Sequence, residues 1–346
     1  MTRRKENYRK KRLDRGIKVR SDSIFLLTSY REIAYTLFPR VGPVACLLLI
    51  PFIFWAIGAD YYIQVAILTF AVGLLALSWD FLASAGLFSL GQALFFGIGS
   101  YVSASFNYYL HFPPLVSMIL ATVVGAVIGT SLLVPVLRLR GIYFSMITLI
   151  LPIILAKIIE ATHILGGSQG LTGLPGLGAE WVKILLSVFV LVFVLFVFRR
   201  IIDTDYGLII RSLKENDRVL ISSGININWT KTQVIFISAL VGSFSGAFMA
   251  HYYGIAGISQ FALDMSILPL AATILGGSGS FAGAILGSAI LVPISEALRF
   301  MGTLRIALFA LVMVFCIAGL PEGLFHYLTR KYQQTEIWVR MEGKES

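Results

Sequence analysis

The sequence predicts an all-α polytopic membrane protein, and three observations lead to this fold class: the composition, the spacing of apolar segments and the distribution of positive charge. Of the 346 residues, 57% are hydrophobic and only 13% are charged, whereas a soluble domain usually contains about 25% charged residues. The mean hydropathy of +0.84 points in the same direction. These values favour a chain that crosses a membrane repeatedly over a soluble enzyme with an apolar core.

Apolar segments follow one another closely along the chain. A spanning helix needs about 20 mainly apolar residues. Segment 80–92 is Gly/Ser-rich and too short to span, so we expect a broken or re-entrant element there, which a bilayer tolerates only where protein or a cavity surrounds it. The segments expected to span are 41–59, 61–79, 93–110, 115–137, 142–159, 182–198, 233–253, 263–277, 281–298 and 304–320.

Positive charge indicates the topology. The net charge of +10 is concentrated at the N-terminus, where basic residues crowd positions 1–20, and such charge is retained on the cytoplasmic side. With about ten crossings, Arg138, Arg330 and the basic segment 199–231 share that side; about eight crossings follow if 263–277 and 281–298 form a re-entrant pair. The sequence therefore predicts a basic cytoplasmic tail over 1–40, a transmembrane domain over 41–320 and a cytoplasmic tail over 321–346.

A basic tail can also bind nucleic acid. No recognition fold surrounds this tail, so we expect no nucleic-acid partner. Contact with anionic lipid headgroups of the bilayer is an additional role that fits the position of the tail before an apolar span.

Segment 199–231 has the pattern of a helix outside the membrane. Asp203 and Asp205 suit a helix N-terminus, and Gly224 suits its end. Apolar residues recur between them at partly helical spacing, and charged residues cover the other face. Such a helix lies on the lipid surface or in a groove of a cytosolic partner, and the residues alone favour neither.

The sequence contains no set of residues that indicates catalysis or nucleotide binding. The pattern G-x-x-x-x-G-K-[ST], which cradles phosphates, does not occur. Glu160 and His163 lie three residues apart without a second pair, so a surface pair is favoured over a metal site. Cys46 and Cys316 lie in separate apolar segments and predict neither a disulfide nor a metal site. We therefore expect no enzyme activity, cofactor or metal, and any energy that the protein uses must come from another polypeptide.

Ionisable residues within the apolar segments are few. Lys157, Glu160, Asp264 and Glu296 lie towards segment ends, where long side chains reach the interface at low cost. Asp80 follows the second predicted span and is expected at the inner interface. An ion-coupled carrier requires carboxylates near the midplane, so this pattern disfavours that class.

Gly-rich helix openings occur once in each half of the chain, over 89–103 and 279–288. Paired Gly-interrupted apolar segments mark the pathway in many transporters. The simpler interpretation is close packing, because glycine lets membrane helices approach one another. Both interpretations stay open, and some of these glycines can serve both purposes.

Five motifs, in chain order, resemble the LivM-type permeases of branched-chain amino acid ABC importers. The resemblance covers about residues 70–320 and rests on SLGQALFFGIGSY at 89–101, RLRGIYF at 138–144, GGSQGLTGLP at 166–175, segment 207–226 ending in SGIN, and segment 275–299, which begins LGGSGS and ends EALR. The sequence departs from the family at Gln92, where His is usual, at Ile142, where Asp is frequent, and at Ala284, where Pro is frequent. Because Gln92 forms hydrogen bonds but does not titrate, urea- or amide-type permeases of the same superfamily remain an alternative.

The resemblance implies a permease subunit that moves branched-chain amino acids across the inner (cytoplasmic) membrane without chemistry of its own. Its implied partners are separate ABC ATPase subunits, a second, LivH-like permease subunit and an extracytoplasmic substrate-binding protein that delivers the small amino-acid substrate. An ion-coupled carrier and an integral-membrane enzyme are the alternatives from other classes. The implied transport-pathway residues are Ser89, Gly91, Gln92, Phe95, Gly97, Gly99, Gly276, Gly277 and Gly279, and the implied ATPase-coupling residues are Gly207, Arg211, Lys214, Glu215 and Gly224.

Overall fold

The computed structural model of the chain describes residues 48–139, 141–215 and 217–302, together with Leu311, Val314 and residues 323–325. The predicted tail over 1–40 lies outside the described residues, as does nearly all of the predicted last span and of the C-terminal tail. Within the described ranges the chain is almost entirely helical, as predicted.

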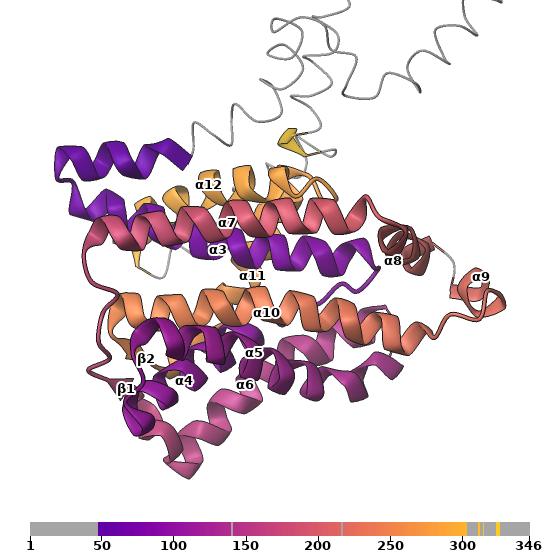
Figure 1. Ribbon diagram of the computed structural model, residues 1–346, viewed down its shortest axis with the longest axis horizontal. Helices are drawn as coiled ribbons and strands as arrows, with labels where there is room; N and C mark the ends of the chain where they lie inside the picture. Colours follow the sequence, from indigo (N-terminus) through magenta and orange to yellow (C-terminus); the bar gives the residue numbers. More distant parts are fainter. Residues whose placement is uncertain are drawn as a thin grey trace, which may run out of the picture. The chain divides into compact units, whose positions relative to one another are not determined.

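Helices α3 to α12 build this part of the chain, and two short strands pair with each other (Figure 1). A bilayer leaves backbone groups no water to bond, so apolar segments satisfy them internally as helices. The helices are α3 (Asp60–Ser84), α4 (Gln92–Leu110), α5 (Pro114–Leu133), α6 (Ile142–Thr162), α7 (Glu180–Ile202), α8 (Asp205–Glu215), α9 (Asp217–Ser222), α10 (Ile227–Tyr253), α11 (Asp264–Gly276) and α12 (Ala282–Ala297). The strands are β1 (Leu171–Thr172) and β2 (Ile255–Ala256), and the short 3-10 helices are η2 (Val134–Arg138), η3 (Ile164–Gln169), η4 (Ile258–Phe261) and η5 (Leu298–Met301).

Six of the described helical segments are long and apolar enough to cross a membrane. They are Asp60–Ser84, Pro114–Arg138, Ile142–Thr162, Glu180–Ile202, Ile227–Tyr253 and Ala282–Met301. Shorter apolar helices cover Leu48–Ile57 and Asp264–Gly276. The chain is thus a multi-pass membrane protein, as its composition predicts, while the total of about ten crossings stays a prediction.

Helices α3 and α10 form the centre of the bundle and run in opposite directions (Figure 1). Helix α10 packs against α4 and α5, whereas α3 packs against α11 and α12, so each half of the chain lies against the central helix of the other half. The burial of the helices agrees with this central position of α3 and α10. In their most apolar stretches, 89% of α3 and 72% of α10 is buried, against 28% for α6 and α7. A crossed, antiparallel arrangement of this kind is typical of inverted repeats in transporters.

Hydroxyl groups fix the two central helices against each other. Ser78 Oγ donates to the carbonyl of Ser238 at 3.0 Å, and Ser238 Oγ donates to the carbonyl of Ser78 at 2.7 Å. One end of the pair is joined further by Ser245 Oγ, which donates to the carbonyl of Ala71 at 2.9 Å. Small side chains permit the close approach, and these bonds satisfy their polar groups inside the bundle.

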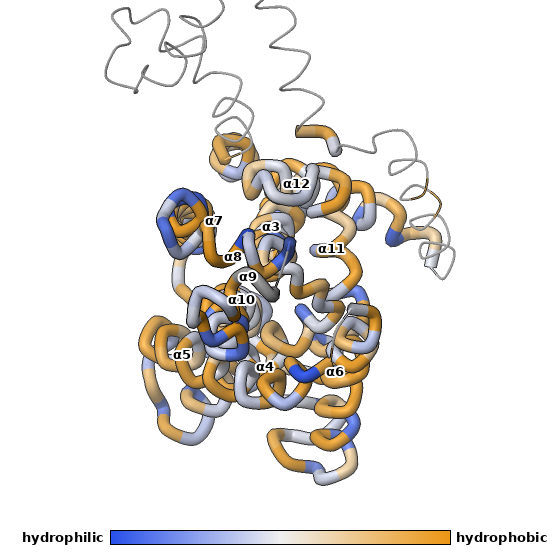
Figure 2. The backbone as a smooth tube through the Cα atoms, turned by 90° about the vertical axis from the view of Figure 1, so that its right-hand side faces the viewer, coloured by the Kyte–Doolittle hydropathy of each residue, from blue (hydrophilic) through white to orange (hydrophobic). Residues whose placement is uncertain are grey.

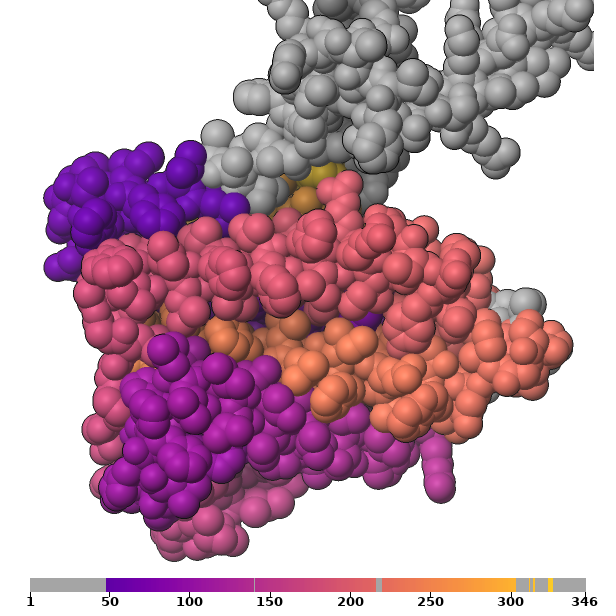
Figure 3. Space-filling model, viewed as in Figure 1, coloured from indigo at the N-terminus to yellow at the C-terminus, as the bar shows by residue number. Residues whose placement is uncertain are grey.

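The connections between helices divide between two ends of the bundle. At the end that we call the α8 end, α8 and α9 follow α7; viewed from there, hydrophilic residues gather on α8 and at the near end of α7 (Figure 2). At the opposite, strand end, β1 pairs antiparallel with β2. His251 holds the strand end together, because its Nε2 lies 3.0 Å from Ser103 Oγ of α4 and its Nδ1 lies 3.0 Å from the carbonyl oxygen of Pro175. Figure 3 shows α7 as a ridge that connects the two ends along one side of the bundle.

The end of α3 departs from the sequence prediction. The predicted second span stopped at residue 79, with a broken or re-entrant element over 80–92, but α3 continues through Asp80 to Ser84 and only 85–91 is irregular. The reason is a tertiary contact: Asp80 is fully buried and accepts a hydrogen bond from the backbone N–H of Gly279 at 2.7 Å. That bond offsets part of the cost of placing a carboxylate inside the bundle. Asp80 therefore does not lie at an exposed interface.

Segment 199–231 contains two helices, α8 and α9, where one was predicted, and its two ends belong to α7 and α10. Helix α8 packs against α7, α3 and α10, and α9 packs against α8 and α10. The chain changes direction between them (Figure 1). The predicted end at Gly224 agrees with the structure, where this residue follows α9 with a φ of +77°.

Candidate functional site

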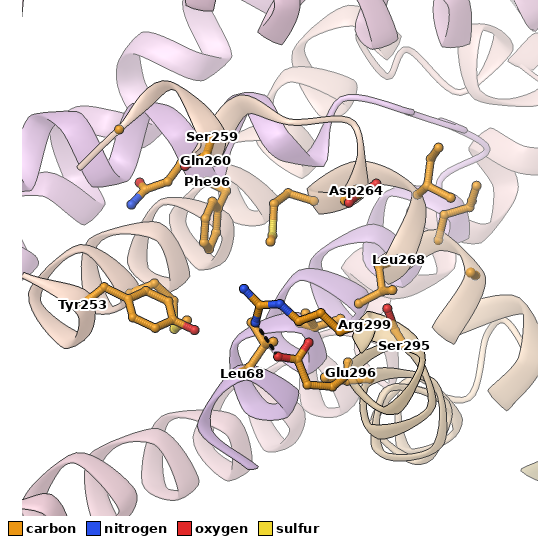
Figure 4. A pocket seen from close by; sticks show the side chains of 18 of the residues that line it. Leu68, Phe96, Tyr253, Ser259, Gln260, Asp264, Leu268, Ser295, Glu296 and Arg299 are labelled. Atoms are coloured by element: carbon orange, nitrogen blue, oxygen red, sulfur yellow. Dashed lines mark hydrogen bonds and ion pairs between the residues drawn. The ribbon is translucent and has the colours of Figure 1, made fainter. Parts of the chain in front are cut away.

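A cavity of about 690 Å³ lies near the strand end, among α3, α4, α10, α11 and α12 (Figure 4). Its position follows from the ends of three helices: Tyr253 ends α10, Asp264 begins α11 and Arg299 follows α12. A concave site of this size among several helices accommodates a small ligand.

An ion pair and Asp264 supply the charged part of the cavity lining. Arg299 Nη1 lies 2.6 Å from Glu296 Oε1, one turn back along the chain. The Glu296 side chain is 13% exposed and that of Arg299 is 69% exposed, so a guanidinium with five N–H donors keeps donors available to a ligand. In Figure 4 the guanidinium reaches towards the middle of the cavity, with Tyr253 on one side and Asp264 on the other.

The remaining walls of the cavity are mostly apolar. Polar exceptions include Ser259, Gln260 and Ser295. The site thus combines a charged region with a large apolar surface, which suits a small molecule that carries charge at one end and an apolar group at the other. The apolar lining residues are Leu68, Val72, Phe96, Met249, Ile255, Met265, Ile267, Leu268, Leu270, Ala271, Ile274 and Val292.

The predicted pathway residues on α4 lie within the bundle and do not line this cavity. Phe95 is fully buried, and its ring lies where a side chain on Gly129 of α5 would be. A Cβ on Gly97 would overlap the ring of Phe261. Close packing therefore occurs at these positions.

The other two α4-region glycines are packed in the same way. A Cβ on Gly91 would overlap the carbonyl of Thr148 in α6, and one on Gly99 would overlap the backbone of Ser243 in α10. Both neighbours are backbone atoms, which cannot rotate away. The Gly-rich motif therefore brings α4 into backbone contact with two helices at once.

Gln92 begins α4 beside the crossing of α3 and α10. Its Oε1 lies 3.1 Å from Ser78 Oγ, and its Nε2 has no hydrogen-bond partner among the residues that the structure describes. Ser89, also fully buried, accepts a hydrogen bond at its carbonyl from Trp79 Nε1 at 2.7 Å. Gln92 thus retains one buried donor, a feature that no sequence pattern shows.

The predicted pathway glycines of the second half form the turn between α11 and α12. A Cβ on Gly276 would overlap the carbonyl of Gly283, so the two helices touch through their backbones. Gly277 and Gly279 have φ angles of +105° and +86°, which favour glycine. The bond from Gly279 to Asp80 places this turn at the α8 end, where segment 85–91 also lies. The structure therefore brings both predicted Gly-rich segments to the same end of the bundle.

Helix α8 sits on the bundle through one face. Gly207, Ile210 and Leu213 are spaced three residues apart and are all buried. Gly207 permits the tight turn after α7, because a Cβ there would overlap the backbone of Ile202. This face fixes α8 to the end of α7.

A tyrosine attaches α8 to the central helix. Tyr206 Oη donates a hydrogen bond to Gln233 Oε1 of α10 at 3.1 Å. Burial raises the pKa of the Tyr206 phenol, so the hydroxyl stays protonated and can donate. This bond adds to the packing of α8 against α10.

The exposed residues of α8 and α9 are mixed in character. Arg211, Lys214 and Glu215 are exposed there. Leu208 and, beyond α8, Ile221 are each 61% exposed. Apolar side chains among charged ones are typical of a surface that binds another protein. We call these five residues the docking surface.

The structure gives no support to the metal pair weighed from the sequence. Glu160 forms an ion pair with Lys157 at 2.7 Å. Within the described ranges, no group of three or more His, Cys, Asp or Glu residues could hold a metal ion.

Four residues at or near the site were not predicted as site residues from the sequence. Asp80 was expected at an interface, although a carboxylate inside a long apolar run is itself a signal of function. Glu296 was noted only as a charge near a segment end and Arg299 only as the end of a motif, although their spacing of three residues could have indicated an ion pair. Tyr253 carried no signal, because its place at the cavity depends on the packing of α10.

Comparison with known proteins gives the same family as the five sequence motifs. The family model described as "Branched-chain amino acid transport system / permease component" matches residues 61–318. The chain is 28% identical over 270 residues, 69% of its length, to the high-affinity branched-chain amino acid transport system permease protein LivM of Salmonella typhimurium. It is 26% identical over 294 residues, 76% of its length, to the protein of the same name from Escherichia coli strain K12.

An archaeal protein is similar as well. The chain is 26% identical over 218 residues, 56% of its length, to a probable branched-chain amino acid transport permease protein LivM of Methanocaldococcus jannaschii. The matches span 64%, 69% and 63% of the lengths of the three relatives. No solved structure matches the chain.

The family match extends from the start of α3 past the end of α12 and so includes the central helices, the cavity and α8. It confirms the resemblance to LivM-type permeases that the five motifs indicated. The chain belongs to the family of permease components of branched-chain amino acid transport systems.

Proposed function

We propose that the chain is the permease subunit of an ABC importer that carries branched-chain amino acids across the inner (cytoplasmic) membrane. The docking surface on α8 carries the proposal, because it is exposed on a helix that is firmly held by the membrane bundle of a chain of this family. ATPase subunits that grip this surface can move the membrane helices through α8. An amphipathic helix lying in a partner's groove is a common mode of such recognition.

The α8 end faces the cytoplasm in this proposal. Arg199 and Arg200 lie in the last turn of α7, and Arg138 ends η2, all in the connections of that end. Positive charge of this kind is retained on the cytoplasmic side. Both termini are then cytoplasmic, with about ten crossings, and the strand end faces the substrate-binding protein.

The cavity receives the substrate. An amino acid in solution carries a carboxylate and an ammonium group, and the cavity offers Arg299 to the first and Glu296 to the second. A branched aliphatic side chain matches the apolar walls. Urea has no apolar part to bury there, so the walls favour a branched-chain amino acid over the urea- or amide-type alternative.

The chain performs no chemistry of its own in this mechanism. ATPase closure moves α8, and the bundle alternates between outward- and inward-facing states. A second, LivH-like permease subunit encloses the path together with this chain. Close packing at Gly91, Gly99 and Gly276 brings backbones together beside that path.

Charge reversal on the docking surface tests the proposal. Arg211→Glu and Glu215→Lys are made separately in the complete importer, reconstituted in vesicles. Both side chains are exposed, so folding stability should change by less than about 0.5 kcal/mol. Loss of an interface contribution of about 2 kcal/mol would weaken ATPase binding about 30-fold. We expect normal insertion, reduced co-purification of the ATPase subunits and loss of ATP-dependent uptake.

Lys157→Glu provides the matched control, because this exposed lysine lies on α6, outside the docking surface. It should leave ATPase binding unchanged. Wild-type ATPase binding and uptake in both α8 variants would contradict the docking role of α8.

A further inference from the structure

We propose that a cluster at the end of α3, buried except for one glycine, transmits movement of α8 to the α11–α12 hairpin and so to the cavity. We call this cluster the α3 junction; it comprises Asp80, Phe81, Phe198, Gly279 and Phe281. The inference rests on the importer function proposed above and adds to it a positioning residue, Asp80, to which the family resemblance gives no role.

Asp80 is the polar part of the α3 junction. It is fully buried, and its Oδ1 accepts the hydrogen bond from the N–H of Gly279 at 2.7 Å. Its Oδ2 is buried without a hydrogen-bond partner among the described residues. Packing alone does not explain a carboxylate at position 80, because burying an apolar side chain of similar size inside the bundle costs less free energy than burying a carboxylate.

Three aromatic rings also connect α3 to the turn between α11 and α12. Phe81 stacks on Phe198, with ring centroids 4.5 Å apart and planes at 22°. Phe198 also contacts Phe281, with centroids 5.8 Å apart. Phe81 follows Asp80 on α3, and Phe281 lies two residues after Gly279, so the rings reinforce the hydrogen bond between α3 and the turn. Phe198 adds α7, which leads directly into α8.

Helix α8 reaches the α3 junction by a second route. A Cβ on Gly86, just beyond the end of α3, would lie 3.1 Å from the Cα of Lys214. Lys214 is also near enough to act electrostatically on Asp80. Helix α8 is therefore linked to the junction through α7, and its Lys214, a residue of the docking surface, lies against the end of α3 beside the junction.

In this proposal the α11–α12 hairpin transmits a displacement of the α3 junction to the cavity. Helices α11 and α12 contribute several walls, including Ile267, Ile274 and Glu296. Backbone contact between Gly276 and Gly283 makes these two helices move together. A displacement of the turn at Gly279 therefore shifts two walls of the cavity at once.

Asp80→Ala and Asp80→Asn test the inference in the complete importer, reconstituted in vesicles. Asn retains an oxygen that can accept from Gly279, whereas Ala does not. For Asp80→Ala we expect ATP hydrolysis within about twofold of wild type, and uptake per ATP hydrolysed at least about tenfold lower. Asp80→Asn should recover most of that ratio. A purely structural defect lowers hydrolysis and uptake together, because fewer complexes are folded, and leaves the ratio unchanged.

Ser84→Ala is the matched control. Ser84 lies one turn further along α3, and its Oγ donates only to the carbonyl of Phe81 in its own helix, at 2.6 Å. This variant should keep the wild-type ratio. If Asp80→Ala does not fold, Phe198→Leu keeps an apolar side chain while removing both ring contacts, and it should lower the ratio in the same way. A wild-type ratio in Asp80→Ala, or in Phe198→Leu, would overturn the proposal.

Hydrogen exchange separates this inference from the proposed function. In the full chain in lipid nanodiscs, Lys214→Ala should speed exchange of the backbone amides over 277–281, because α8 no longer supports Asp80. If wild-type vesicles show no ATP-driven uptake, the importer function is wrong, yet faster exchange in Lys214→Ala still supports the link between α8 and the hairpin. Unchanged exchange in both Lys214→Ala and Asp80→Ala would overturn that link.

Discussion

Gly276→Ala tests whether the glycines between α11 and α12 serve close packing. An alanine Cβ at this position would overlap the carbonyl oxygen of Gly283, and a Cβ on Gly283 would overlap the carbonyl of Gly276 in return. Both obstructing groups are backbone atoms, so no side chain can rotate away. The substitution therefore forces the two helices apart.

The expected cost follows from this geometry. Overpacking of a well-packed core costs about 1–3 kcal/mol. We expect about 2–3 kcal/mol here, because rigid backbone must move. The greater helix propensity of alanine offsets little of this, since Gly276 is the last residue of α11. A loss of about 2 kcal/mol lowers the ratio of folded to unfolded protein about 30-fold.

Reversible unfolding by sodium dodecyl sulfate in mixed micelles measures this cost. Gly176→Ala is the matched control, because the nearest atom to a Cβ there is 4.0 Å away. The control should stay within about 0.5 kcal/mol of wild type. If Gly276→Ala unfolds like the control, the packing argument fails. If it is stable but transports poorly, the pathway role predicted from the sequence gains support.

Further substitutions test the other contacts. Tyr206→Phe removes the hydrogen bond to Gln233 and should lower the free energy of unfolding by about 1 kcal/mol in the same titration; no change would show that the bond does not stabilise α8. His251→Ala leaves two hydrogen-bond partners at the strand end unmatched and should cost about 2–4 kcal/mol; wild-type stability would contradict that arrangement. Arg299→Gln breaks the ion pair with Glu296 and removes the cation of the cavity, so the leucine concentration for half-maximal uptake should rise about tenfold; an unchanged value would exclude Arg299 from substrate contact.

Local patterns were sufficient to predict most of the helices. The predicted spans 93–110 and 142–159 lie within α4 and α6, because runs of apolar residues bounded by Gly, Pro or charge leave few alternatives in a membrane. The amphipathic pattern after residue 203 also predicted a helix outside the membrane, and α8 buries residues of its apolar face. The similarity to known permeases confirmed the family that the five motifs indicated.

Long-range contacts account for what the sequence did not show. Asp80 and Gly279 are separated by 199 positions, and only their meeting lets α3 continue past a carboxylate. The cavity depends on where α10, α11 and α12 end relative to one another, which no local pattern encodes. The two predicted Gly-rich openings proved to lie at the same end of the bundle, because α3 and α10 run in opposite directions.

The most direct test of the central claim is uptake by vesicles that contain this chain with its ATPase subunits and second permease subunit, and the binding protein outside. We predict that labelled leucine accumulates only when both ATP and the binding protein are present. Unlabelled valine or isoleucine should reduce that accumulation, and urea should not. Uptake of urea without uptake of leucine would contradict the substrate class, and no ATP-dependent uptake of either, with the binding protein loaded, would contradict the importer function.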